Sequence, residues 1–252
     1  MLATALMLGL ATSACASSLL VDFRGQYFNL APYEPAAVTA ATGPLSSSDS
    51  VTGSSMTATA NFGSLLVTTT SAASGLYNSM GGSKAEWQDS LTITGGSGIG
   101  MITLVFEFSG ELAASDTGAG SHAYTTYSVA TTVFGASSVI RDGGLYSNSG
   151  PTGNSIANFS IDNIPFTFGT PLNFAFSLEA RSEAVGDGVS PGAPFSASAS
   201  VSNLSLTLAS IQVSQPGAII SSESNTVYGV PESSPSVLLM LGLTAFAVRR
   251  RH

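Results

Sequence analysis

The stretch Phe195–Val213, FSASASVSNLSLTLASIQV, has the most regular hydrophobic pattern in the chain. Apolar residues alternate with serine as far as Val201, and after Asn203 they continue one position out of phase. An alternation with a period of two is typical of a strand that buries one face. A shift of one residue within such a strand indicates a β-bulge. The stretch therefore predicts one long strand with a bulge at Ser202–Asn203.

Similar alternation recurs along the chain. It runs from Trp87 to Ile93 and from Ile102 to Phe108, and the glycine cluster at 95–98 between these segments predicts a β-hairpin. Further strands are expected within residues 19–28, 56–70, 123–134, 156–161, 166–168 and 174–178. Prolines at 165 and 171 restrict the strands near them to sheet edges or turns. Segments 31–55 and 143–154 are rich in Gly, Pro and Ser and are expected to be loops.

About ten strands separated by glycine-rich turns predict an all-β fold. We expect one antiparallel β-sandwich or jelly-roll domain over residues 17–228. It is flanked by an apolar signal helix at 1–16 and by a hydrophobic helix within 229–252.

The body of the chain is acidic and carries few charges. Between the two ends it has only four cations, Arg24, Lys84, Arg141 and Arg181, against fourteen carboxylates. Such a surface repels phosphate backbones, which excludes nucleic acid as a partner. The other polar residues are mainly Ser, Thr and Asn, a composition typical of secreted proteins.

The N-terminal segment has the pattern of a secretory signal peptide. An apolar run from Leu2 to Ala11 is followed by Ala14 and Ala16, the small-x-small pattern of a cleavage site. Cys15 is the only cysteine, so a chain cut after Ala16 has no thiol for a disulfide, a metal site or catalysis. Lipidation of Cys15 is an alternative, although its upstream residues fit plain cleavage equally well.

The C-terminal segment, 229–252, has three parts. Val230, Pro231 and Glu232 precede the uncharged run Ser233–Val248, and Arg249, Arg250 and Arg251 follow it. The apolar run is close to the minimum length for a membrane helix, and a cluster of arginines after it stays cytoplasmic. We therefore expect this segment to engage the membrane, with the rest of the protein on the outer side.

This tail resembles the sorting signal of the PEP-CTERM family of bacterial exported proteins. In that family a Val-Pro-Glu-Pro motif precedes a short hydrophobic helix and an Arg-rich end; here Ser233 replaces the second proline, and Pro235 follows. Segments 84–93 and 197–228 also resemble the family. The resemblance implies an exosortase-type processing enzyme as partner, and transient anchoring in the membrane before release to the cell surface or medium. It also implies association with exopolysaccharide or a biofilm matrix.

Few residues suggest catalysis or metal binding. His122 is the only histidine before the terminal His252, so a zinc site would need carboxylates from distant strands and a catalytic triad could only use His122. The pairs Glu107 with Glu111 and Glu179 with Glu183 are candidates for the two carboxylates of a glycosidase, but exposed positions on a soluble sheet explain them more simply. Calcium candidates are Asp162-Asn163, and Asp187-Gly188 beside Glu183. We expect no cofactor, no metal and no catalytic residue.

Three functional hypotheses therefore remain open. The leading one is a non-enzymatic, exported envelope or matrix protein that is sorted through its tail, with polysaccharide as a candidate partner. The second is a carbohydrate-binding module, for which Trp87, Tyr124 and Tyr127 are candidates for a stacking platform, although the phase of Trp87 favours the core. The third is a secreted hydrolase that uses paired carboxylates.

Overall fold

The computed structural model describes residues 17–27, 31–74, 77–117, 121–133, 136–147, 150–153, 156–186 and 196–229. These ranges contain fourteen strands and no helix, which confirms the all-β class. Accordingly, none of the described residues belongs to a helix long and apolar enough to cross a membrane. The two helices expected at 1–16 and within 229–252 lie outside the described residues.

The strands form two antiparallel sheets. The larger sheet has eight strands in the order β10 (Gly150–Gly153), β9 (Ala136–Tyr146), β8 (His122–Val133), β12 (Leu172–Val185), β6 (Ser79–Thr94), β1 (Ser18–Tyr27) and β2 (Val38–Ala40), with β14 (Ile219–Ser222) paired to β6. The smaller sheet has six strands in the order β11 (Phe159–Thr167), β7 (Ile99–Thr117), β13 (Ser196–Val213), β5 (Ser64–Ser74), β4 (Ser54–Asn61) and β3 (Leu45–Val51).

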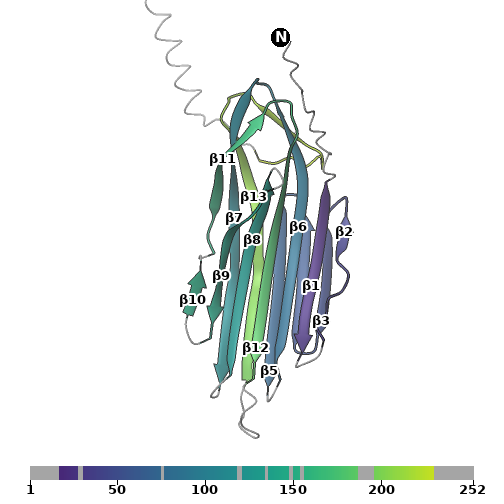
Figure 1. The fold of residues 1–252 in the computed structure, drawn as a ribbon, viewed down its shortest axis with the longest axis vertical. Helices are drawn as coiled ribbons and strands as arrows, with labels where there is room; N and C mark the ends of the chain where they lie inside the picture. The colour runs from purple at the N-terminus through teal and green to yellow at the C-terminus, as the bar shows by residue number, and fades with distance from the viewer. Residues whose placement is uncertain are drawn as a thin grey trace, which may run out of the picture.

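The two sheets face each other in an elongated body whose strands run along its long axis (Figure 1). The main apolar core lies between them, and its largest fully buried side chains include Trp87, Phe106, Phe176 and Leu204. Successive strands often change sheet: β5, β7, β11 and β13 belong to the smaller sheet, and β6, β8, β9 and β12 belong to the larger one. The predicted arrangement of two antiparallel sheets is thus observed.

The bulge predicted in Phe195–Val213 is confirmed. The pairing of β13 with β5 shifts between Val201 and Leu204, and Asn203 has a positive φ of 50°. The neighbouring strand β7 accommodates the bulge with a glycine. Gly110 has a φ of 152°, and a Cβ at this position would lie only 2.8 Å from Cα of Leu204. A side chain therefore cannot be placed there without moving the backbone of β13.

The hairpin predicted at 95–98 is wrong. The turn does join β6 to β7, but these strands belong to different sheets, so the chain crosses from one layer to the other. Each of the two strands has one apolar face. A turn between two such strands can join neighbours within one sheet, as in a hairpin, or strands that belong to two different sheets. Alternation reveals the buried face of a strand but not its neighbour in the sheet.

Two predicted loops also contain strands. Segment 31–55 includes β2 and β3, and segment 143–154 includes the end of β9 and all of β10. These strands lie at or next to sheet edges, and β3 is rich in serine, so their hydrophobic signal is weak. The proline rule holds, because Pro165 lies in the edge strand β11 and Pro171 lies in the turn before β12.

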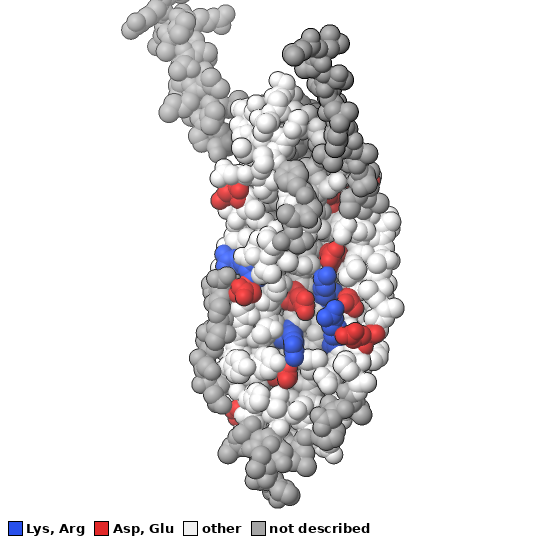
Figure 2. Space-filling view, viewed as in Figure 1, with Lys and Arg blue, Asp and Glu red and all other residues white. Residues whose placement is uncertain are grey.

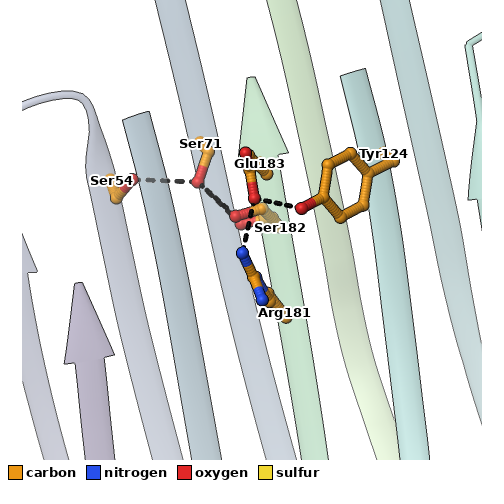
Figure 3. A network of polar contacts seen from close by, with 6 residues as sticks. All are labelled: Ser54, Ser71, Tyr124, Arg181, Ser182 and Glu183. Atoms are coloured by element: carbon orange, nitrogen blue, oxygen red, sulfur yellow. Dashed lines mark hydrogen bonds and ion pairs between the residues drawn. The ribbon is translucent and has the colours of Figure 1, made fainter. Parts of the chain in front are cut away.

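Side-chain size falls along the buried face of β12. This face begins with Leu172, Phe174, Phe176 and Leu178 and ends with Ala180, Ser182 and Ala184. At the small-residue end, Ser182 bonds Ser71 of β5 (Oγ to Oγ, 2.8 Å), and Ser71 bonds Ser54 of β4 (2.9 Å), as Figure 3 shows. Hydroxyl groups thus link the two sheets where large apolar residues are absent.

Candidate functional site: the chain ends and a charged hollow

The residues predicted to direct export lie outside the described residues. They comprise the cleavage-site residues Ala14 and Ala16, the motif residues Val230, Pro231 and Glu232, and the basic cluster Arg249, Arg250 and Arg251. The structure does describe the residues that adjoin them, Ser17 on one side and Gly229 on the other. These two ends of the described chain meet at a single buried carboxylate.

Asp89 of β6 is that carboxylate, and its exposure is only 1%. It accepts hydrogen bonds from the hydroxyls of Ser224 (2.5 Å), Tyr228 (2.6 Å) and Ser17 (3.1 Å), and from the backbone N–H groups of Ser90 (2.8 Å) and Ser224 (3.1 Å). A buried carboxylate is stable only when its oxygens are bonded in this way. Asp89 therefore requires both ends of the domain to be in place.

The register of β6 explains why the ends meet at this residue. β1 pairs with β6 from Ser79 to Gln88, and β14 pairs with it from Leu91 to Thr94. The N-terminal strand β1 and the C-terminal strand β14 thus pair with successive parts of β6 on the same side of that strand. Asp89 lies at the junction between them.

The segment that leads to the sorting motif is attached to the domain up to its last described residues. Tyr228 is buried and stacks on Trp87, with 6.0 Å between the ring centroids. The carbonyl of Gly229 accepts a hydrogen bond of 2.8 Å from the N–H of Ile211. Burial, followed by the bond to Asp89, raises the pKa of the Tyr228 hydroxyl well above its usual value of 10.0.

The proposed aromatic platform does not form. Trp87 and Tyr127 face the core with exposures of 1% and 3%, whereas Tyr124 lies on the outer face of the larger sheet. Tyr124 instead stacks on Tyr146, with 5.2 Å between their centroids. Two of the three side chains are therefore unavailable for sugar stacking, which weighs against the platform in its predicted form.

The predicted carboxylate pairs lie in rows on outer faces. Glu107 and Glu111 are exposed on β7 in the smaller sheet. Glu179 and Glu183 lie on the outer face of β12, separated by Arg181, which bonds Glu183 at 2.6 Å. Glu183 also accepts a hydrogen bond from the hydroxyl of Tyr124, whose pKa is raised above its usual range by partial burial and by this bond. Neither pair is positioned across a cleft.

The metal candidates remain apart. Within the described ranges, no three His, Cys, Asp or Glu side chains come together as a metal site would require. Asp162 and Asn163 lie at a bulge of the edge strand β11, and His122 is the half-buried first residue of β8. Asp187 and Gly188 lie outside the described residues.

A hollow of about 190 Å³ on the outer face of the larger sheet was not predicted. It is lined by Asp22, Arg24, Met80, Gly82, Ser83, Lys84, Glu179 and Arg181. Charged side chains gather on this face, while most of the visible surface around them is uncharged (Figure 2). Three of the four cations in the body of the chain thus line one hollow.

Strand register produces this grouping. Gly82 of β6 pairs with Arg24 of β1 on one side and with Arg181 of β12 on the other. Lys84, one step along the same face, pairs with Asp22 and Glu179. The result is a row Arg-Gly-Arg beside a row Asp-Lys-Glu.

The hollow suits binding better than acid catalysis. Asp22 and Glu179 flank it, but Lys84 stands between them and Glu179 is exposed. The general acid of a glycosidase is typically enclosed by apolar groups that favour its protonated form. The hollow lacks such an enclosure and instead presents guanidinium groups to solvent.

Comparisons with known proteins do not identify the chain: no family model, no curated protein and no solved structure matches it.

Proposed function

We propose that this chain is a non-enzymatic exported protein that is delivered to the cell envelope or extracellular matrix through its C-terminal tail. On this proposal, an exosortase-type enzyme cuts the tail near Val230–Glu232, after the hydrophobic run has held the protein in the membrane. The domain itself has a jelly-roll topology, which the strand orders β11-β7-β13-β5 and β9-β8-β12-β6 support.

One observation carries the proposal: the two residues directly before the predicted motif are hydrogen-bonded to the sheets of the domain. Tyr228 donates a hydrogen bond to Asp89, and the carbonyl of Gly229 accepts one from Ile211. The predicted motif begins at the next residue, Val230. Cleavage near the motif therefore removes none of the contacts described for the core. The same holds at the other end, where Ser17 directly follows the predicted cleavage site at Ala16.

The test is the intact mass of the protein recovered from its native cells, for the wild type and for Pro231→Ala. We expect a wild-type form that begins at Ser17 and lacks Arg249–Arg251, and a variant that keeps its tail in the membrane fraction. Glu223→Ala provides the control, because Glu223 is exposed and lies outside the motif. A wild-type mass that includes the three arginines would contradict the proposal.

A second candidate function, saccharide binding, is favoured by one observation, the charged hollow of the larger sheet. It is compatible with the first, because a matrix protein needs a surface that contacts the matrix. A binding function predicts a defined ligand group, which the geometry of the hollow suggests.

A further inference from the structure

We propose that the hollow binds the carboxylate group of an acidic polysaccharide, held over Gly82 between Arg24 and Arg181. The choice of a saccharide over other carboxylates rests on the proposed function, whereas the carboxylate site itself rests on the geometry that follows.

The distribution of cations is the first argument. The body of the chain carries fourteen carboxylates and four cations, yet Arg24, Lys84 and Arg181 line the same hollow. Scattered ion pairs would keep a sheet soluble without bringing the cations together. Their grouping makes the hollow the most cation-rich place that the described residues form on this acidic protein.

The second argument is the spacing of the two arginines. Arg24 and Arg181 lie two strands apart with Gly82 between them, so their Cα atoms are about 10 Å apart at the usual strand spacing. Each guanidinium has a planar set of donors that matches the two oxygens of a carboxylate. Both arginines line the hollow, one on each side of Gly82, so an anion held over Gly82 lies between them.

Gly82 lies at the bottom of the hollow, between the two arginines. The backbone conformation does not require a glycine at this position. Its φ is not among the positive values that favour glycine. A Cβ at this position would meet the carbonyl oxygens of Arg24 at 3.6 Å and Ala180 at 3.7 Å, which are ordinary contacts. Since a Cβ fits against the backbone at this position, the glycine is better explained by the open space above it.

Arg24 is the cation that is available to a ligand. Lys84 pairs with Glu86 at 2.9 Å, and Arg181 pairs with Glu183 at 2.6 Å and lies 5.8 Å from the ring centroid of Tyr124. Arg24 is exposed and has no ion pair within the described part of the chain. The ligand carboxylate would supply this missing partner.

The surroundings favour a saccharide over a densely charged polymer. Asp22 and Glu179 lie beside the two arginines and would repel closely spaced anionic groups. Both can accept hydrogen bonds from sugar hydroxyls, and Thr126 and Ser128 extend the polar surface along β8. A uronate polymer alternates carboxylates with hydroxyls and matches this pattern. The hollow is smaller than the roughly 300–1,000 Å³ of drug-sized pockets, which fits a single sugar unit.

The test is titration calorimetry on the full chain in detergent, with a tetramer of galacturonic acid as the probe. We expect binding to the wild type, and at least a tenfold loss of affinity in Arg24→Ala and in Gly82→Leu, which fills the hollow. Arg141→Ala removes the same charge from another position and is the control, with less than a twofold change expected. Thermal melting of each variant checks that it is folded.

Two further ligands complete the experiment. The neutral galactose tetramer and a tetraglutamate peptide should each bind at least tenfold more weakly than the uronate. Equal binding of the neutral sugar, or unchanged affinity in both hollow variants, would overturn the carboxylate site. Equal binding of the peptide would overturn the saccharide assignment. Tail processing would be unaffected in each case, so failure here is distinct from failure of the proposed function.

Discussion

The two ends of the core hold the sheets together in different ways. At one end aromatic rings pack between the sheets, where Phe176 of the larger sheet and Phe106 of the smaller sheet have centroids 4.8 Å apart. Trp87 lies beside them and contacts Phe174, Phe176 and Tyr228, with ring centroids between 5.1 and 6.0 Å apart. At the other end the facing residues are small, and hydroxyl groups bridge the sheets. Ser71 of β5 donates to the carbonyl of Ser182 at 2.9 Å, a bond from one sheet directly to the backbone of the other.

The difference teaches that side-chain size sets the distance between the sheets. A serine oxygen lies only two bonds from its own Cα, so a bond to the opposite backbone requires the sheets to approach more closely than the usual spacing of about 10 Å. Ser83 of β6, which donates to the carbonyl of Thr68 at 2.8 Å, shows the same approach. The sandwich is therefore wide where it is aromatic and narrow where it is rich in hydroxyls.

The largest expected loss of stability comes from creating a cavity at the wide, aromatic end of the core. Trp87→Ala removes the side chain on which three aromatic rings pack, and such a cavity costs about 3–5 kcal/mol of unfolding free energy. Chemical denaturation measures this loss. Gln88→Ala, on the outer face of the same strand, should change stability by less than about 0.5 kcal/mol. A loss of similar size in both variants would contradict the wide-end packing.

Enlarging a buried residue should destabilise the narrow, hydroxyl-rich end of the core. Ser182→Leu inserts a bulky group where the sheets are closest, at a cost of about 1–3 kcal/mol, and the lost bonds to Ser71 and Thr69 add to it. The matched control is Ser177→Leu, which faces outward on the same strand. If the two leucine variants melted at the same temperature, the space around Ser182 would accommodate a leucine side chain. The proposed difference in width between the two ends would then be wrong.

Alkaline pH should weaken the aromatic end through Tyr228. The pKa of Tyr228 is higher in the folded state than in the unfolded chain, where it is about 10, so the unfolded state ionises first as pH rises. The contribution of Tyr228 to stability should therefore be constant below pH 10 and fall above it, by up to about 1.4 kcal/mol per pH unit. Tyr228→Phe should reduce that fall. A fall of the same size in the wild type and in Tyr228→Phe would count against the prediction.

The smallest effect is expected on the outer face of β12. Glu183→Gln weakens the pair with Arg181, which is solvent-exposed, and such pairs contribute less than about 1 kcal/mol. Ser182→Ala, one residue away but inside the narrow end, should cost more, about 1–3 kcal/mol. Urea denaturation of both variants gives the comparison. A larger loss in Glu183→Gln would show that the outer pair, and not the hydroxyl network, stabilises this end.

Much of the fold could be predicted from local patterns. The alternation in Phe195–Val213 located β13 and its bulge, and the apolar phase of Trp87 located that side chain in the core. The edge strands β2, β3 and β10 were missed, because strands in contact with solvent need little hydrophobic signal. The candidate hollow was missed for another reason. Arg24, Gly82 and Arg181 come from three strands far apart in sequence, and only strand pairing brings them into one row.

The sequence by itself determined which face of each clearly alternating strand is buried, where β13 bulges and how the buried side chains change in size along a strand. It also carries the features at the two ends on which the export proposal rests. These properties are local, since they depend on residues within a few positions of each other. Only the tertiary structure decided which strands are neighbours. That choice depends on how distant segments pack together, and it brings Ser17 and Tyr228 to Asp89 and sets two arginines on either side of a glycine.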